Sequence, residues 1–243
     1  MNILIWNENR HERRDFVARR IYPNGIHGVL SDCLRAAGHV VITATLDEPN
    51  HGLSEEKLAE TDVFIWWGNL AHAEVDEQIV DMVNRHVLAG MGLIVLHSGY
   101  FSSVFKKLIG TSCRLNCNGT ESSEKIWNVN PSHPITRGVG QFFDLAEEEV
   151  YGEHFDVPEP DELIFLSWFK SGEVFRSGMT FYRGKGKIFY FRPGHETYPT
   201  YHNKYVQKVI KNAVNWARPI HSSVNQDIEL DQIEMIYEKE SFI

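Results

Sequence analysis

Cysteine, basic charge and long apolar runs are all scarce in this chain of 243 residues. Its three cysteines, Cys33, Cys113 and Cys117, form an odd count, which excludes a fully paired disulfide framework and favours a reducing, cytoplasmic location. Acidic side chains outnumber basic ones by 33 to 24, and the formal charge of -9 argues against a general nucleic-acid or anionic-membrane binder. No apolar stretch approaches the ~20 residues that a transmembrane helix needs. The first residues, MNILIW, also lack the basic region and cleavage site of a signal peptide.

The first half of the chain alternates short apolar runs with amphipathic segments. Apolar runs predict buried strands, and apolar residues at helical spacing predict helices between them. Such alternation is typical of a parallel sheet with right-handed crossovers. The predicted strands are 2–6, 40–46, 62–68, 92–97 and 186–194, and the predicted helices are 26–37, 55–60, 72–90, 102–110 and 203–217.

Between residues 111 and 185 this rhythm is interrupted. Short candidate strands follow one another here, separated by turn signals, as in an antiparallel or mixed subregion. We therefore expect an α/β fold with a mostly parallel sheet flanked by helices and a partly antiparallel insertion at about 111–185. Residues 1–218 should form a single domain, and 219–243 should be an acidic tail that docks on the body or on a neighbouring subunit.

Polar and charged residues gather where the predicted strands end. In an open parallel sheet, ligands bind outside the carboxyl ends of the strands. A single histidine at such a place is most often a structural imidazole bonded to backbone, but several on one edge favour a functional pocket. We expect catalytic roles for His97 and His195, and substrate contacts from Glu8, His72 and Arg192. His27, in the first turn of the helix after the first strand, faces the same edge.

The stretch EEEVYGEHF, residues 147–155, carries a second signal. If it is a strand, Glu149, Tyr151 and Glu153 share one face. We predict that Glu149 and Glu153 are catalytic carboxylates and that Tyr151 contacts the substrate. An exposed edge strand with a charged face is the alternative explanation.

Six motifs, in this order along the chain, resemble the ThuA (trehalose utilisation) family: WNENRHE, YPNGIH, GLIVLHSG, NPSHPITRG, EEEVYGEHF and YFRPGHETYP. The resemblance implies a flavodoxin-like, class I glutamine-amidotransferase-like fold. It also implies a role in the metabolism of trehalose and related disaccharides, including 3-keto sugars made by partner dehydrogenases. The motif histidines and carboxylates of the family correspond to His27, His97, Glu149 and His195.

One departure from true amidotransferases bears on the chemistry. Those enzymes place a nucleophilic cysteine on a tight strand-to-helix turn and serve it with a later His-x-Glu pair. This chain has LHSGY at the turn, and His195 is followed directly by Glu196. Glutamine hydrolysis by a thiol is therefore not expected. A serine hydrolase using Ser98 is the least favoured hypothesis, because the G-x-S-x-G surround is missing.

The leading hypothesis is an enzyme that acts on trehalose-type or 3-keto disaccharides through His/Glu acid–base chemistry, as a hydrolase, lyase or isomerase. A divalent metal, zinc, bound by His27, His97 and His195 is an open extension, with Glu149 or Glu153 as general base. In the alternative, these histidines hydrogen-bond to one another or to carboxylates without metal. A catalytically silent carbohydrate-binding or regulatory protein is the rival function. A homo-oligomer with a small sugar as its ligand is expected.

Overall fold

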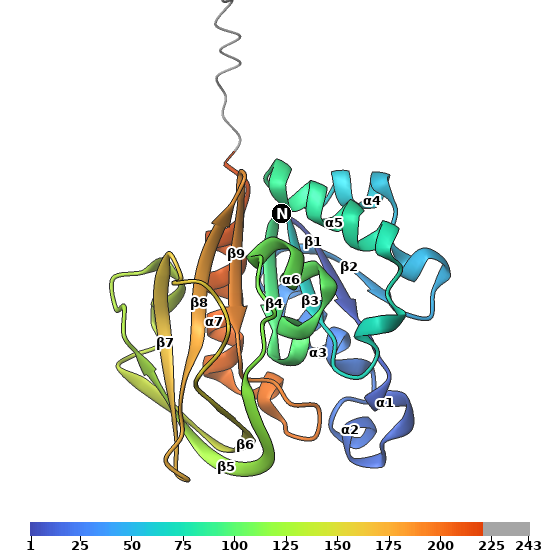
Figure 1. Cartoon of the computed structure of the whole chain (residues 1–243). Coiled ribbons are helices and arrows are strands. Elements are labelled where there is room, and N and C mark those ends of the chain that lie inside the picture. Colours follow the sequence, from blue (N-terminus) through green and yellow to red (C-terminus); the bar gives the residue numbers. More distant parts are fainter. Residues whose placement is uncertain (221–243) are drawn as a thin grey trace, which may run out of the picture.

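A computed structural model of the chain describes residues 1–220, with the side chain of residue 118 excepted. Most of the expected acidic tail, residues 221–243, lies outside the described residues. The described strands form one nine-stranded sheet in the order β2-β1-β3-β4-β9-β8-β7-β5-β6 (Figure 1). The strands are β1 (Asn2–Asn7), β2 (Val40–Thr45), β3 (Val63–Trp67), β4 (Gly92–Leu96), β5 (Asn116–Asn128), β6 (Phe142–Gly152), β7 (Glu162–Phe169), β8 (Val174–Arg183) and β9 (Gly186–Phe191).

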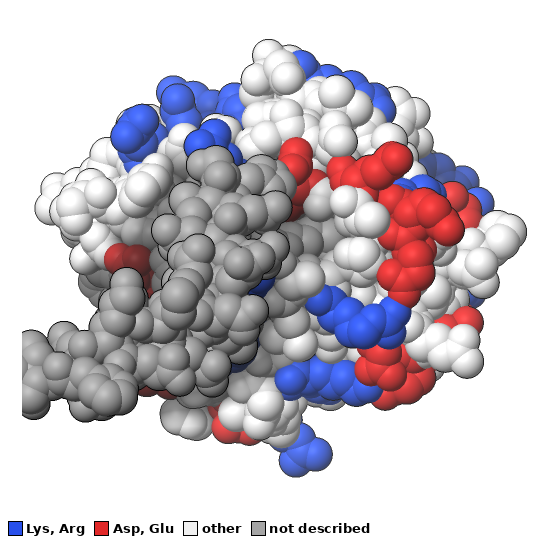
Figure 2. All heavy atoms as spheres, turned by 90° about the horizontal axis from the view of Figure 1, so that it is seen from above, with Lys and Arg blue, Asp and Glu red and all other residues white. Residues whose placement is uncertain are grey.

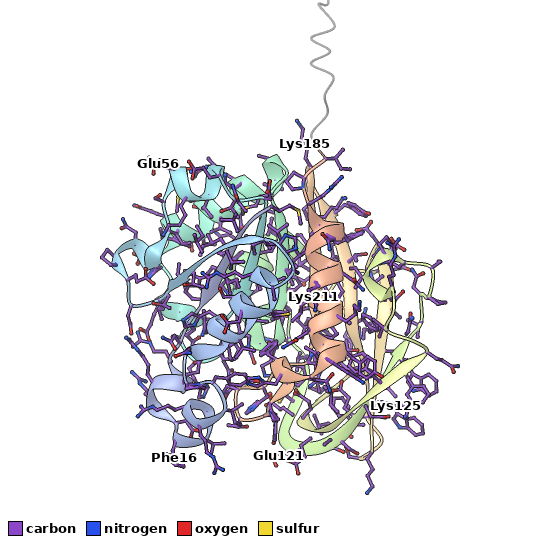
Figure 3. The ribbon with its side chains drawn as sticks, turned by 180° about the vertical axis from the view of Figure 1, so that it is seen from behind. Phe16, Glu56, Glu121, Lys125, Lys185 and Lys211 are labelled. Carbon is purple, nitrogen blue, oxygen red and sulfur yellow. The ribbon has the colours of Figure 1, made fainter. Side chains whose placement is uncertain are left out.

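Five strands, β2, β1, β3, β4 and β9, run parallel, which confirms the expected fold class. Successive side chains of a strand point to opposite faces, so each buried strand feeds two apolar layers. In β1, for example, Leu4 and Trp6 belong to the layer under α4–α6, whereas Ile3 and Ile5 belong to the layer under α3 and α7. Figure 3 shows α3 and α7 covering the second face. The helices are α1 (His11–Arg14), α2 (Phe16–Ile21), α3 (Gly25–Arg35), α4 (Glu55–Ala59), α5 (Glu77–Ala89), α6 (Ser103–Ile109) and α7 (Lys204–Ala217).

The insertion extends the same sheet past β9. Strands β8, β7, β5 and β6 pair antiparallel, and all four lie in sequence between the neighbouring strands β4 and β9. β5 extends over both polar and apolar residues, and its polar first half pairs with the end of β6. The bend of β5 and β6 carries them across the lower end of the sheet in Figure 1, which is the carboxyl end of the parallel strands.

Local signals set several helix ends. Ser54 is the N-cap of α4, since its hydroxyl accepts the N–H of Lys57 at 3.2 Å. The helix predicted over 72–90 instead begins at Glu77. Its expected first turn is a short 3-10 turn, and the amide of Asp76 donates to His51 Nε2 at 3.0 Å rather than to a helical carbonyl. No helix among residues 1–220 is long and apolar enough to cross a bilayer.

The contact between β4 and α7 leaves no space for a side chain at Gly92. A Cβ at this position would lie 2.3 Å from the carbonyl oxygen of Ala217. We expect Gly92→Ala to lower the free energy of unfolding by about 1–3 kcal/mol, since backbone must move to relieve the overlap. Gly152→Ala is the matched control, because its Cβ would meet nothing closer than 3.7 Å, and we expect a change within about 0.5 kcal/mol. Urea denaturation followed by tryptophan fluorescence measures both, and equal stabilities of the two variants would contradict this packing.

Candidate functional site

The parallel register brings two functional strand ends side by side. Leu96, the last residue of β4, pairs with Phe191, the last residue of β9, so His97 and Arg192 follow as neighbours. His97 has a φ of +50°, in the left-handed region that a residue with a Cβ seldom adopts. Such backbone strain at a strand-to-helix turn is common at functional sites. The turn directs the imidazole of His97 into the edge of the sheet.

The His97 ring is completely buried and has two different nitrogen environments. Nδ1 lies 3.0 Å from the carbonyl oxygen of Arg192, which can only accept, so Nδ1 carries a proton. Nε2 faces Glu149 Oε2 at 3.4 Å but has no hydrogen-bond partner among the described residues. The ring stacks on Tyr151 at 5.5 Å and meets His195 edge-on at 5.5 Å. The predicted convergence of His97 and His195 is thus present.

Neighbouring charges shift the pKa values of His97 and Glu149 in opposite directions. Burial disfavours the His97 imidazolium, but Glu149, with Glu148 and Glu196 behind it, outweighs burial and raises the pKa of His97. Burial likewise opposes ionisation of Glu149, yet His97 and a hydrogen bond from Cys117 Sγ at 3.1 Å lower its pKa to about 2. Each of the two groups thus favours the ionised form of the other.

His195 lies beside this pair in the neutral state. Burial lowers the pKa of His195 to about 4, and the charge of His97 acts in the same direction. Thr197 contacts His195 Nδ1 through its hydroxyl at 2.7 Å and its backbone N–H at 3.2 Å. Gly194 sets the direction of this loop, because at its φ of +140° a Cβ would lie 2.0 Å from the Tyr201 hydroxyl oxygen.

Glu196 completes the cluster, and sequence reasoning did not assign it a role. Its Oε1 lies 3.1 Å from His11 Nε2 and 3.6 Å from His195 Nε2, and its Oε2 accepts from Asn69 Nδ2 at 3.2 Å. Burial raises the pKa of this carboxyl. His11 was missed because the polar segment after β1 has no apolar periodicity to reveal α1. Two signals could have revealed His11, namely its place in the WNENRHE motif and its position soon after the end of a strand.

Arg192 was predicted to contact substrate, but its side chain is completely buried and is turned to partners within the protein. Its guanidinium hydrogen-bonds the carboxylate of Glu124 on β5 and lies 3.3 Å from Glu148 Oε2 on β6. Burial raises the pKa of Glu124 to about 7 despite this cation. Glu148 also accepts from the Gly194 amide at 3.2 Å and from the Thr200 hydroxyl. Arg192 and Glu148 thus position the loop that carries His195 and Glu196.

Glu8 and His72, from which substrate contacts were expected, both have neighbours within the protein that the sequence did not indicate. The Glu8 carboxylate is buried and accepts three backbone N–H groups, from Asn69, Leu70 and Ala71, at 2.7–2.9 Å. It therefore fixes the loop after β3, whose Asn69 reaches Glu196. The ring of His72 lies edge-on to Phe101 at 5.9 Å, and burial lowers its pKa to about 4.

Glu153 and His27 are not part of the cluster. Strand β6 ends at Gly152, and the Glu153 carboxylate pairs with Arg176 at 3.0 Å and accepts the Phe155 amide at 2.9 Å. His27 Nδ1 lies 2.9 Å from Asn7 Nδ2. The ligand atoms of His97, His195 and Glu196 lie within 4.8 Å of one another, so Glu196 takes the place that was predicted for His27 in a metal-ligand set. Tyr151 does reach the cluster, through its ring contact with His97.

Solvent reaches the cluster from one side. The side chains of Glu149 and His195 are each 20% exposed, whereas Glu196 is 3% exposed and His97 is inaccessible. A ligand arriving from solvent would meet Glu149 and His195 first. His97 lies behind them and acts on both.

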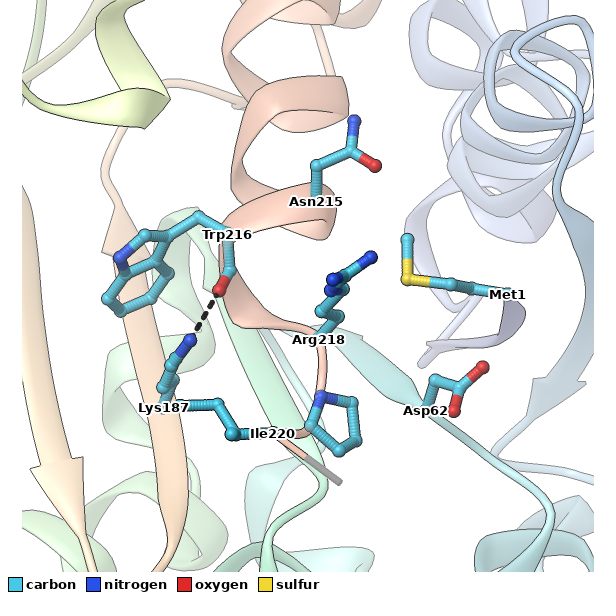
Figure 4. A pocket seen from close by; sticks show the side chains of 8 residues that line it. Met1, Asp62, Lys187, Asn215, Trp216, Arg218 and Ile220 are labelled. Atoms are coloured by element: carbon cyan, nitrogen blue, oxygen red, sulfur yellow. Dashed lines mark hydrogen bonds between the residues drawn. The ribbon is translucent and has the colours of Figure 1, made fainter. Parts of the chain in front are cut away.

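A pocket of about 580 Å³ lies at the other edge of the sheet (Figure 4). Met1, Asp62 and Lys187 contribute to it from the starts of the strands, and Lys187 donates to the Trp216 carbonyl at 3.0 Å. Among its described lining residues there is no histidine and one carboxylate. The paired imidazoles and carboxylates, at the edge where such sheets bind ligands, make the His97 cluster the stronger candidate.

Comparison with known proteins identifies the family and the fold. A family model described as ThuA, trehalose utilisation, matches residues 2–217. No protein with a curated description matches the chain in sequence. A structure described as a ThuA-like protein from Parabacteroides merdae is 14% identical, covers 93% of each chain and has a TM-score of 0.66.

Two further structures share the fold. A cytoplasmic protein from Salmonella typhimurium is 13% identical over 90% of this chain and 100% of that chain, with a TM-score of 0.61. A glutamine amidotransferase from Thermotoga maritima is 12% identical over 89% of this chain and 97% of that chain, with a TM-score of 0.53. These likenesses establish a glutamine-amidotransferase-like fold, as predicted.

Replacement of Glu8 separates a structural role from substrate binding. In Glu8→Gln, one carboxylate oxygen becomes an NH₂ group, so at least one backbone N–H in the loop after β3 loses its acceptor in either amide orientation. We expect the free energy of unfolding to fall by about 2–3 kcal/mol. Glu159→Gln, at an exposed position, is the control and should leave stability unchanged. Urea denaturation gives the comparison, and a Glu8→Gln protein as stable as the control would refute the structural role.

Proposed function

Because the chain belongs to the ThuA family, we propose that it is a sugar-directed enzyme acting on trehalose-type or 3-keto disaccharides. The proposal is carried by one observation: His97, Glu149 and His195 converge at the carboxyl edge, with Glu149 and His195 on the open side. These two groups are placed to exchange protons with a sugar hydroxyl or with the carbon next to a carbonyl. His97 is a positioning residue, which holds Glu149 from behind.

Thiol and serine chemistry receive less support from the geometry. Cys117 is the cysteine that contacts the cluster, but burial raises its pKa to about 11, so it is a thiol that donates to Glu149 rather than a thiolate nucleophile. The Ser98 hydroxyl lies 3.1 Å from the hydroxyl of Tyr151, which is not a general base in its neutral form. We therefore favour proton transfer over covalent acyl-enzyme chemistry.

We also infer a small sugar, rather than nucleic acid, as the ligand, and a cytoplasmic location like that given for the Salmonella protein. Basic and acidic side chains lie next to each other on the face in Figure 2. Arg85 pairs with Glu55, and Lys107 pairs with Glu77 and Asp81, so these cations are neutralised locally. A basic field of the sort that attracts a phosphate backbone is not supported there.

Glu149→Gln tests the proposed catalytic carboxylate. Incubation of the full chain with trehalose and with 3-keto-trehalose, followed by chromatography of the products, measures turnover. We expect kcat to fall about 10²–10⁴-fold in this variant, the range typical of a lost general acid or base. Glu147→Gln, at an exposed position two residues earlier on β6, should keep the activity of the unmodified chain.

Two results would count against the enzyme. A Glu149→Gln protein that turns over sugar at the rate of the Glu147→Gln control removes Glu149 from the mechanism. Tight binding of either sugar with no product at any time would instead assign the chain to the rival function, a catalytically silent carbohydrate-binding protein.

A further inference from the structure

Two imidazoles and one carboxylate in the cluster bring potential ligand atoms close together. His97 Nε2, His195 and Glu196 offer ligand atoms within 4.8 Å of one another. Because the Arg192 carbonyl fixes the proton of His97 on Nδ1, a neutral His97 presents the lone pair of Nε2. That nitrogen is buried and has no hydrogen-bond partner among the described residues. A histidine whose other nitrogen donates to a backbone carbonyl is the usual arrangement at metal centres.

The other two ligands have matching outer partners. For His195 Nε2 to offer its lone pair, Nδ1 must carry the proton and donate to the Thr197 hydroxyl at 2.7 Å, in place of accepting the Thr197 backbone N–H at 3.2 Å. Asn69 donates to one oxygen of Glu196 and leaves the other oxygen, Oε1, on the side of His195. His11 lies 3.1 Å from the same Oε1 and can remain as its outer partner.

We propose that His97, His195 and Glu196 bind one divalent transition-metal cation, with Zn²⁺ as the probe. Two histidines and a glutamate form a known catalytic zinc shell that keeps a position open. With Zn–N bonds of about 2.0–2.1 Å, tetrahedral ligands stand about 3.4 Å apart, so side-chain rotation must close the present spread by roughly 1 Å. His195, whose side chain is 20% exposed, has the more room for this adjustment, whereas Glu196 is buried and held by Asn69 and His11.

This inference rests on the site of the proposed function and adds a Lewis acid to it, with His195 as a ligand and Glu149 as the remaining proton acceptor. A ligand from solvent would approach such a cation past the partly exposed side chains of Glu149 and His195. A sugar hydroxyl bound there would have its oxygen polarised by the cation. Its O–H bond would break, with the proton passing to the Glu149 carboxylate and the electron pair remaining on the sugar oxygen.

The full chain is first stripped of metal with a chelator and then titrated with Zn²⁺ by calorimetry. This measurement tests the site without reference to activity. We expect one Zn²⁺ per chain, with affinity reduced at least about 100-fold in Glu196→Gln and in His97→Gln, more than the ~10–100-fold typical of outer partners. Circular dichroism verifies that each variant is folded. Glu196→Gln keeps the test valid if replacement of the buried His97 prevents folding.

An exposed His–Glu pair provides the matched control for adventitious zinc. His86 Nε2 lies 2.8 Å from Glu55 Oε2 on the surface of α5 and α4. His86→Gln should retain the binding of the unmodified chain. Equal loss in His86→Gln and Glu196→Gln, unchanged zinc affinity in Glu196→Gln, or no binding by the unmodified chain at millimolar Zn²⁺ would each overturn the proposed centre.

The result separates the metal centre from the sugar chemistry. Site-specific zinc binding together with no turnover of either sugar retains the centre and rejects the proposed function. Turnover by a chain that binds no Zn²⁺ in the titration retains the function and rejects the centre.

Discussion

The buried guanidinium of Arg192 is the interaction on which the site depends. It lies just past the end of β9, where the parallel half of the sheet meets the antiparallel half, and it binds Glu124 on β5 and Glu148 on β6. A buried cation without such partners would cost several kcal/mol, so the strands of the insertion must return to this point. The Arg192 carbonyl meanwhile receives His97 Nδ1. One residue thereby fixes the path of the insertion and the orientation of an imidazole.

Alternation along β6 divides two tasks between adjacent carboxylates. Glu148 points to Arg192 and to the amide of Gly194, whereas Glu149 points to His97 and Cys117. Neighbouring residues of a strand face opposite sides, so this strand can stabilise the loop after β9 and supply a partly exposed carboxylate at once. The loop and the carboxylate are held by a common backbone, which limits how far either can move relative to the other.

The strand pattern of the sequence was sufficient to predict the sheet class and the edge at which the site lies. Apolar runs end at Leu96 and Phe191, and the rule for carboxyl ends then indicates His97 and His195. Period-two alternation similarly placed Glu149 and Tyr151 on one face. The pattern could not show that Arg192 is buried, because its partners are 44 and 68 residues away in the chain. A charged residue after a strand is predicted to be exposed unless such partners are known.

The direction of the loops accounts for the remaining differences between the predicted site residues and the observed cluster. Beyond the last residue of a strand, periodicity no longer says where a side chain points, so His27 and Glu196 could not be ranked as ligands. The left-handed turn at Gly194, which only glycine fits beside Tyr201, turns the chain so that His195 and Glu196 both reach the cluster. Polar strand segments give no such signal either, since the first half of β5 carries no apolar alternation from which its bounds could be predicted.

The turn after β4 shows how this fold can host other chemistry than amide hydrolysis. Its left-handed first residue is the strained position from which a strand-to-helix turn presents a nucleophile in hydrolases. Here that residue is His97, whose ring is buried and tied to a backbone carbonyl, so it cannot attack a substrate from solvent. The left-handed backbone of His97 instead directs Nε2 toward Glu149 and toward the His195–Glu196 pair. The same backbone geometry thus gathers imidazoles and carboxylates rather than exposing a nucleophile, and the chemistry that a fold hosts follows from the side chains placed on it.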